Sequence, residues 1–214
     1  MKTRIALLCA AAVVLNSCLG VRAGIVIKAD GSGKLSLEYR VSQELESLGR
    51  LDGNESRPAV PVGKADFERT AARIPGLMLS QYSSRDVPNS SGGRDLVTKV
   101  TLDFKDSGAL LAFLDGAGSS AALVEDGSGK LLRLVFLEPS GGVTNPDLLS
   151  LLREISGAYE LDLSFSLPKN ADITTIPASI PAAKLVSNGK KASFSIGMGD
   201  LLSLNEGLVL EIRW

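Results

Sequence analysis

Apolar and polar residues alternate along most of the chain with a period of two. The clearest example is residues 159–168, where Leu161, Leu163, Phe165 and Leu167 are separated by Asp or Ser. Since successive side chains of a strand point to opposite faces, this pattern predicts strands with one buried and one exposed face. The same alternation predicts eight to ten short strands, at residues 25–27, 34–41, 77–87, 94–104, 121–124, 131–137, 159–168, 184–196 and 207–214.

Helical spacing of apolar residues occurs in several intervals between these strands. The segment Lys64–Arg73 is closed by Pro75-Gly76, and Asn145-Pro146-Asp147 is a strong helix start before a leucine-rich segment. Further short helices are predicted at residues 42–49 and 106–116, and a single turn of helix at residues 199–204. We therefore expect an α+β fold, in which three or four short helices pack on one face of a curved, mostly antiparallel sheet built of hairpins.

The hexapeptide Asp-Gly-Ser-Gly-Lys-Leu occurs twice, at residues 30–35 and 126–131, each time between two alternating segments. A calcium loop is excluded because its first and twelfth ligand positions hold Lys28 and Tyr39 in the first copy and valines in the second. A phosphate-binding loop is excluded because each Lys is followed by Leu rather than by Ser or Thr. The pattern is typical of a hairpin turn, in which we expect Gly33 and Gly129 to adopt a positive φ. Duplication of a hairpin unit and independent use of the same turn residues both remain open.

The residues on which most enzyme active sites depend are scarce. The chain contains no histidine and two cysteines, Cys9 and Cys18, so His-dependent triads and zinc sites are excluded. Ser187-Asn-Gly-Lys190 has the S-x-x-K spacing of penicillin-binding enzymes, but Asn-Gly predicts a turn between strands where that motif needs a helix. We therefore predict no catalytic residue, no metal site, no cofactor and no enzymatic activity.

Positive and negative charges are balanced along the chain. There are 23 basic and 24 acidic residues, the formal net charge is −1, and aromatic residues make up 5% of the chain. Because nucleic-acid binding needs a basic surface, we expect no nucleic-acid partner. Beyond the N-terminal region no apolar run reaches the length of a membrane-spanning helix.

The N-terminus has the three parts of a secretory signal, with Lys2 and Arg4, the apolar run Ile5–Leu15, and small polar residues before Cys18. Leu15-Asn16-Ser17-Cys18 resembles a bacterial lipobox, with Asn16 at a position where a small residue is usual. The resemblance implies that the Cys18 thiol is diacylated and that residues 1–17 are removed. Cys9 would leave with the signal, so the mature chain would keep one thiol, at the position that an anchor needs. The alternative is an ordinary signal peptide with a coincidental cysteine.

The layout of the remaining chain resembles that of small LppM-type bacterial lipoproteins. The matching features are the hairpin segment Ile25–Val41, the proline-rich stretch Pro168–Pro181, the turn Asn188-Gly189 and the Trp-containing terminal segment Gly207–Trp214. The resemblance implies a cell-envelope domain with a curved sheet and a capacity to bind lipid or glycolipid. It assigns no individual ligand-binding residue.

Together these patterns predict a lipoprotein signal peptide at residues 1–17, a lipidated N-terminus and short tether at 18–24, and a single α+β envelope domain at 25–214. We expect attachment to a bacterial membrane through the lipid on Cys18, on the periplasmic or surface side. One functional hypothesis is a non-enzymatic binding module for a lipid, glycolipid or other envelope component. The other is a structural or assembly lipoprotein that docks on an envelope protein. A large apolar cavity would favour lipid binding, whereas a filled core with an exposed apolar patch would favour protein docking.

Overall fold

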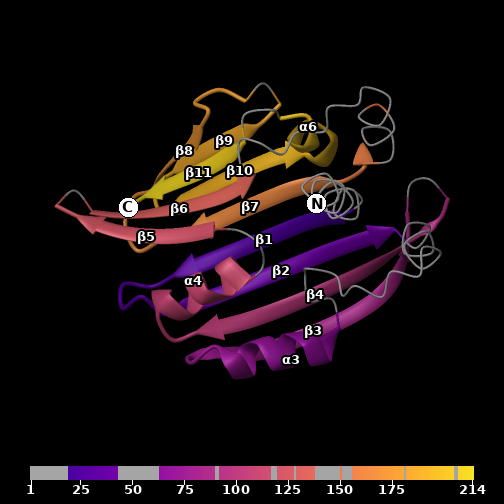
Figure 1. The fold of residues 1–214 in the computed structure, drawn as a ribbon, viewed down its shortest axis with the longest axis horizontal. Helices are drawn as coiled ribbons and strands as arrows, with labels where there is room; N and C mark the ends of the chain where they lie inside the picture. The colour runs from indigo at the N-terminus through magenta and orange to yellow at the C-terminus, as the bar shows by residue number, and fades with distance from the viewer. Residues whose placement is uncertain are drawn as a thin grey trace, which may run out of the picture.

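The computed structural model describes residues 19–42, 63–89, 92–116, 120–127, 129–137, 150, 156–180, 182–204 and 207–214. Two β-sheets and three helices make up this described part of the chain (Figure 1). The predicted α+β class and the predominance of antiparallel pairing are confirmed.

The larger sheet has seven strands, in the order β3-β4-β2-β1-β7-β10-β9. Its strands are β1 (Leu19–Ile27), β2 (Gly33–Ser42), β3 (Leu77–Pro88), β4 (Arg94–Phe104), β7 (Glu160–Ser166), β9 (Lys184–Asn188) and β10 (Lys191–Gly197). All neighbours are antiparallel except β1 and β7, which run parallel at the centre of the sheet. A parallel pair cannot be joined by a tight turn, and β1 and β7 are indeed far apart in the sequence.

The smaller sheet has four antiparallel strands, in the order β5-β6-β11-β8. Its strands are β5 (Ser120–Asp126), β6 (Gly129–Leu137), β8 (Asp172–Ile176) and β11 (Leu208–Arg213). The expectation of one sheet was therefore wrong. Alternation assigns each side chain to a face, but it does not say which distant strand is the partner, and β11 pairs with β6 and β8 rather than with the hairpins of the larger sheet.

The helices of the described residues are α3 (Lys64–Arg73), α4 (Ser107–Gly116) and α6 (Met198–Leu202). The bounds of α3 agree with the prediction, and its buried Phe67 stacks on Tyr39 of β2 at a ring-centroid distance of 6.3 Å. Asp106 accepts a hydrogen bond from the Ala109 backbone N–H at 2.9 Å, which satisfies a free donor at the start of α4. The helices predicted at residues 42–49 and from Asn145 lie outside the described residues. No described helix has the length and apolarity that crossing a bilayer requires.

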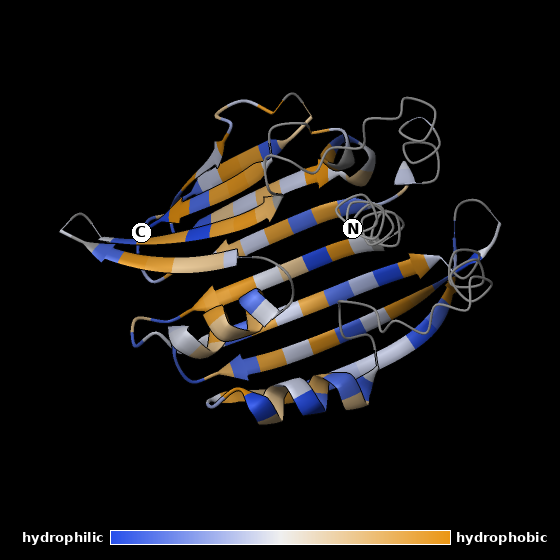
Figure 2. Ribbon diagram, in the orientation of Figure 1, coloured by the Kyte–Doolittle hydropathy of each residue, from blue (hydrophilic) through white to orange (hydrophobic). Residues whose placement is uncertain are grey.

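Side chains from both sheets meet in one hydrophobic core. Leu35, Phe165 and Phe194 of the larger sheet and Leu210 and Ile212 of the smaller sheet are at most 2% exposed and belong to the same cluster. In Figure 2 hydrophobic and hydrophilic segments alternate along the strands of the larger sheet, as period-two patterning requires. The larger sheet therefore has one face in the core, and most of its other face is open to solvent.

The first strand begins earlier than the sequence pattern suggested. Residues 19–24, predicted as a tether, form part of β1, where Leu19 pairs with Val41 and Val21 pairs with both Tyr39 and Leu161. The tether prediction was wrong because the glycines and the charged residue at positions 20, 22 and 24 are not typical of a strand when the sequence is considered alone. Their positions face the open side of the sheet, while Ala23 and Ile25 face the core.

The two copies of the hexapeptide form different turns. In the first, Ile27 pairs with Gly33, so residues 28–32 form the loop, Gly31 has φ +83°, and Asp30 Oδ1 accepts hydrogen bonds from the Ser32 backbone and hydroxyl. In the second, Asp126 pairs with Gly129, so only residues 127 and 128 lie between the strands. Gly129 has φ +142°, as predicted, whereas the prediction of a positive φ at Gly33 was wrong. The pairing of the flanking strands, and not the sequence of the hexapeptide, therefore sets the length of the loop.

Candidate functional site

The open face of the larger sheet carries a row of uncharged residues, all but one of them with short side chains, that runs across the strands. Gly24 of β1 pairs with Ser36 of β2 on one side and with Ser164 of β7 on the other. We call the complete set the neutral row; it comprises Ser193, Ser164, Gly24, Ser36, Thr101 and Gln81. Since each member comes from a different strand, the register of the sheet creates the row.

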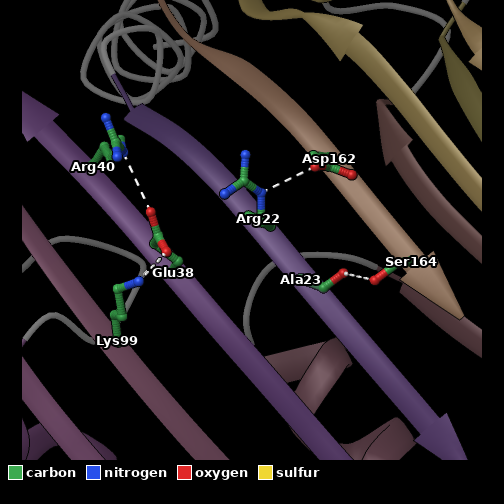
Figure 3. Close-up of polar contacts among 7 residues, drawn as sticks. All are labelled: Arg22, Ala23, Glu38, Arg40, Lys99, Asp162 and Ser164. Carbon is green, nitrogen blue, oxygen red and sulfur yellow. Dashed lines mark hydrogen bonds and ion pairs between the residues drawn. The ribbon is translucent and has the colours of Figure 1, made fainter.

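A charged row lies two residues away along the strands (Figure 3). Arg22 Nε is 3.0 Å from Asp162 Oδ2. Lys99 Nζ is 2.7 Å from Glu38 Oε2, and Arg40 Nε is 3.3 Å from Glu38 Oε1. The Glu38 side chain is only 14% exposed, and the hydrogen bond from Lys99, with a further one from Arg40, lowers the pKa of its carboxyl below the ordinary value. Arg22 and Lys99, the cations of the charged row nearest to the neutral row, therefore already have a carboxylate partner.

An open hollow of about 790 Å³ lies over the neutral row, except for Ser193, and over part of the charged row. Gly24, Ser36 and Ser164 form part of its lining, and the long side chains of Arg22, Glu38 and Lys99 also line it. The hollow exists because side chains along the neutral row are short. A Cβ atom added at Gly24 would lie 3.4 Å from Ser164 Oγ, which is ordinary van der Waals contact, so a side chain at this position would take up part of the hollow.

Several polar groups of the hollow are available to a ligand. Within the described residues, the side chains of Ser36, Gln81, Ser83 and Thr101 have no hydrogen-bond partner. Hydroxyl and amide groups both donate and accept hydrogen bonds. Because the nearby charges are paired with one another, the hollow suits a polar ligand of low net charge, such as a polyhydroxylated molecule.

Tyr159 closes one end of the open face. Its hydroxyl donates a hydrogen bond to Asp95 Oδ1 at 3.1 Å, and Asn89 Nδ2 donates to the same oxygen at 3.0 Å. The Tyr159 ring covers Gly20, where an added Cβ atom would lie 3.2 Å from Tyr159 Cδ1. A second hollow, of about 220 Å³, lies beside this ring and is lined by Gly20, Arg40 and Asp162 among others.

The predicted lipobox residues Leu15, Asn16, Ser17 and Cys18 lie outside the described residues, so lipidation stays a prediction. Ser187 and Lys190 belong to the β9–β10 hairpin, where Ser187 Oγ accepts a hydrogen bond from the Ile173 backbone N–H at 3.2 Å. This is the turn that Asn-Gly predicted. Among the residues described, no three His, Cys, Asp or Glu side chains are grouped so as to hold a metal ion.

The residues of the hollow were not predicted from the sequence. Serine, threonine and glycine at the outward positions of five strands were a visible signal, since these positions alternate with apolar ones. However, Gly24 and Ser164 lie 140 residues apart, and only the parallel pairing of β1 with β7 brings them together.

No family model matches the chain, and no curated protein matches it by sequence. Among solved structures, the chain is similar to the folded domain of the LppM protein of Mycobacterium tuberculosis, determined by NMR, with a TM-score of 0.47 and 14% sequence identity. The similarity covers 92% of this chain and 90% of that chain. It is weak, and it concerns the arrangement of strands and helices alone.

Proposed function

We propose that this protein is a bacterial membrane-anchored lipoprotein, and that it acts as a non-enzymatic binding module for a polar component of the cell envelope. The anchor is the predicted lipid on Cys18, supported by the signal-like N-terminus and the lipobox resemblance. The observation that carries the binding function is the polar hollow over the neutral row.

The hollow favours sugar-like ligands over acyl chains. In the described residues, two hollows lie on the polar face of the larger sheet, and the buried side chains of the two sheets pack into a shared core. Acyl chains need an apolar cavity, whereas hydroxyl-rich ligands need paired donors and acceptors. The proposed ligand is therefore polyhydroxylated, either the sugar part of a glycolipid or an envelope glycan.

The position of the anchor supports a ligand near the membrane. Leu19, the first residue of β1, directly follows Cys18, and Gly24 lies five residues further along the strand. At about 3.3 Å per residue, this separation is about 17 Å. A lipid on Cys18 would hold the hollow within reach of polar groups that project from the same membrane.

The anchor is tested by labelling cells with a palmitate analogue and comparing the wild type with Cys18→Ala. We expect label on the wild type, and an unlabelled Cys18→Ala protein that keeps the size of the precursor. A wild-type protein without label contradicts the lipoprotein assignment.

The binding function is tested by purifying residues 19–214 from an envelope extract and identifying what co-purifies by mass spectrometry. We expect a carbohydrate-bearing species, with acyl chains if the source is a glycolipid and without them if it is a glycan. Gly24→Val, which places a branched side chain on the floor of the hollow, is expected to lose this species. If the variant retains it, the ligand binds elsewhere and the proposed site is wrong.

Docking on a protein partner is a second candidate, supported by the edge strand β9. Leu185 and Val186 on this strand are 37% and 55% exposed, and an edge strand with exposed apolar side chains can accept a strand from another protein. A single stoichiometric protein that is lost from Val186→Asp and retained by Gly24→Val would favour this function over carbohydrate binding.

A further inference from the structure

The part of the neutral row that lies under the hollow crosses the strands of the larger sheet. In its antiparallel section, Ser36 lies opposite Gly24, and Thr101 lies opposite both Ser36 and Gln81. The parallel register of β1 and β7 continues the row from Gly24 to Ser164. These residues come from the adjacent strands β3-β4-β2-β1-β7, and each of them lines the hollow. The polar floor of the hollow is therefore a line directed across the sheet and not along one strand.

The spacing of groups along this line is set by the sheet. Adjacent strands lie about 4.8 Å apart, so the intervals from Gln81 on β3 to Ser164 on β7 span about 19 Å. A β-1,4-linked glycan is an extended chain that advances by about one strand spacing with each sugar. About five such sugars laid along the row would each lie over a different strand. An extended peptide advances by only about 3.3 Å per residue, so its side chains would fall out of step with the strands.

The charged row borders this line on one side. Arg22, Glu38 and Lys99 each lie two residues from a member of the neutral row, on adjacent strands, and carry longer side chains that also line the hollow. Because Arg22 is paired with Asp162, and Lys99 with Glu38, this border offers polar contacts without a net charge. It would confine an uncharged chain from the side and direct it across the strands.

A β-bulge adds polar groups at the β3 end of the line. Leu79 pairs with Leu102 and Gln81 with Thr101, so Ser80 is an extra residue between these pairs. The Ser80 hydroxyl donates a hydrogen bond to the Thr101 backbone oxygen at 3.1 Å, whereas the Gln81 amide has no partner among the described residues. Since β3 is an edge strand, a chain that reaches Gln81 can continue past the edge of the sheet.

We propose that the hollow binds an extended β-1,4-linked glycan of uncharged sugars, which runs across the strands along the neutral row and contacts the protein over about five sugars. This inference rests on the proposed carbohydrate-binding function and names the ligand class. The ligand is a linear polymer of the envelope rather than the compact sugar part of a glycolipid. An internal stretch of the polymer is sufficient, because the row opens at the β3 edge.

The first test is titration calorimetry of the full-length protein in detergent with β-1,4-linked oligosaccharides of N-acetylglucosamine, from one to six sugars long. We expect the affinity to rise by about fivefold with each sugar that reaches a further strand, and to level off beyond about five sugars. A β-1,6-linked hexamer of the same sugar, which is more flexible, is expected to bind at least about tenfold more weakly. A β-1,4-linked hexamer that binds no more tightly than the disaccharide, or equal binding of the two hexamers, overturns the proposal.

The second test uses variants at the two ends of the row. Gln81→Ala removes the outermost polar contact on β3, so the affinity is expected to level off about one sugar earlier than in the wild type. Ser193→Ala is the matched control, because Ser193 continues the row on β10 but does not line the hollow. It is expected to keep the length dependence of the wild type, and an equal change in both variants overturns the proposed path of the glycan.

The ligand that co-purifies with the protein separates this inference from the proposed function. A linear glycan that is lost from Gly24→Val supports both. A compact, acyl-bearing glycolipid that is lost from the same variant overturns the extended glycan and leaves the carbohydrate-binding function intact. If no oligosaccharide binds and no carbohydrate co-purifies, both are overturned.

Discussion

The two faces of the larger sheet are made by the same strands, but one face is buried and apolar while the other is largely exposed and polar. On the inner face, Leu35, Phe165 and Phe194 are at most 2% exposed and pack into the shared core. On the outer face, their sequence neighbours Ser36 and Ser164 belong to the neutral row, which lies under the open hollow. Period-two alternation thus lets one face of the strands maintain the fold while the other face stays open to solvent, where we propose that a ligand binds.

This division implies that stability and binding respond to different residues. Removing apolar volume from the inner face leaves a cavity, because the surrounding side chains relax only partly. Adding volume to the outer face fills space that is now open to solvent. Four pairs of substitutions test how far stability and binding depend on different residues.

The largest effect is expected from Phe194→Ala on the inner face of β10, compared with its neighbour Ser193→Ala on the outer face. Phe194 is fully buried, so its truncation is expected to lower the free energy of unfolding by about 3–5 kcal/mol. The change at Ser193 is expected to stay within about 0.5 kcal/mol. Urea unfolding followed by circular dichroism measures both. A large loss from Ser193→Ala would show that the outer face also supports the fold.

The next effect concerns binding. Gly24→Val places a branched side chain in the hollow and is expected to weaken binding of the co-purified carbohydrate by about tenfold or more, or about 1.4 kcal/mol. The free energy of unfolding is expected to stay the same or rise slightly, because glycine weakens a strand interior. Titration calorimetry and urea unfolding separate the two quantities.

Ser166→Val is the matched control for Gly24→Val. Ser166 faces the same side of β7 as Ser164 but does not line the hollow. The Ser166→Val variant is expected to bind the co-purified carbohydrate as tightly as the wild type does. Equal weakening by both variants would mean that the whole face, rather than the hollow, contacts the ligand.

Thr175 is a polar residue on a buried face that is otherwise mostly apolar. It lies on the inner side of β8, is 4% exposed, and its hydroxyl has no hydrogen-bond partner among the described residues. A buried unpaired hydroxyl is unfavourable, so Thr175→Val is expected to raise the free energy of unfolding by about 1 kcal/mol. Thr174→Val on the exposed side of the same strand is expected to change it by less than about 0.5 kcal/mol. A loss of stability in Thr175→Val would reveal a partner for the hydroxyl.

The smallest effect is expected from Glu38→Gln in the charged row. Lys99 and Arg40 lower the pKa of Glu38 in the folded state below 4.5, so the unfolded state binds more protons as the pH falls. The contribution of the carboxylate is therefore complete above pH 4.5 and is lost as the pH falls through the folded-state pKa. Because the cations are about half exposed, we expect a loss of about 0.5 kcal/mol at pH 7 that disappears in acid.

Urea unfolding at several pH values measures this difference between the wild type and Glu38→Gln. Lys99→Met provides the comparison, since Lys99 is the main cause of the lowered pKa. In a protein that already carries Lys99→Met, Glu38→Gln is expected to lower the free energy of unfolding by less at pH 7 than it does in the wild type. A difference that persists unchanged in acid would assign the effect to packing rather than to charge.

Local features of the fold could be predicted from the sequence, and long-range features could not. The bounds of α3 follow from helical spacing that ends before Pro75-Gly76, and the β9–β10 hairpin follows from Asn188-Gly189. The parallel pairing of β1 with β7 could not be predicted, because alternation is the same whichever strand lies alongside. The candidate site depends on that pairing, so the position of the hollow could not be derived either.

The repeated hexapeptide shows the same limit on a smaller scale. Identical residues form a loop over residues 28–32 in one copy and a loop of two residues in the other. Gly33 starts a strand beside Phe104, whereas the backbone oxygen of Trp214 lies against Gly129. Turn residues allow a hairpin at both places, but contacts with distant strands decide its register.

Mechanical force on a lipid at Cys18 would enter the domain along the axis of β1. The backbone hydrogen bonds between β1 and β2 run across this direction, and the slanted bonds to β7 flank the other side. A pull on Leu19 would therefore load these bonds in shear and together, whereas a pull on a hairpin turn would break them one after another. A lipid on Cys18 would therefore apply a force directed toward the membrane to a central strand, whose two neighbours would resist it together.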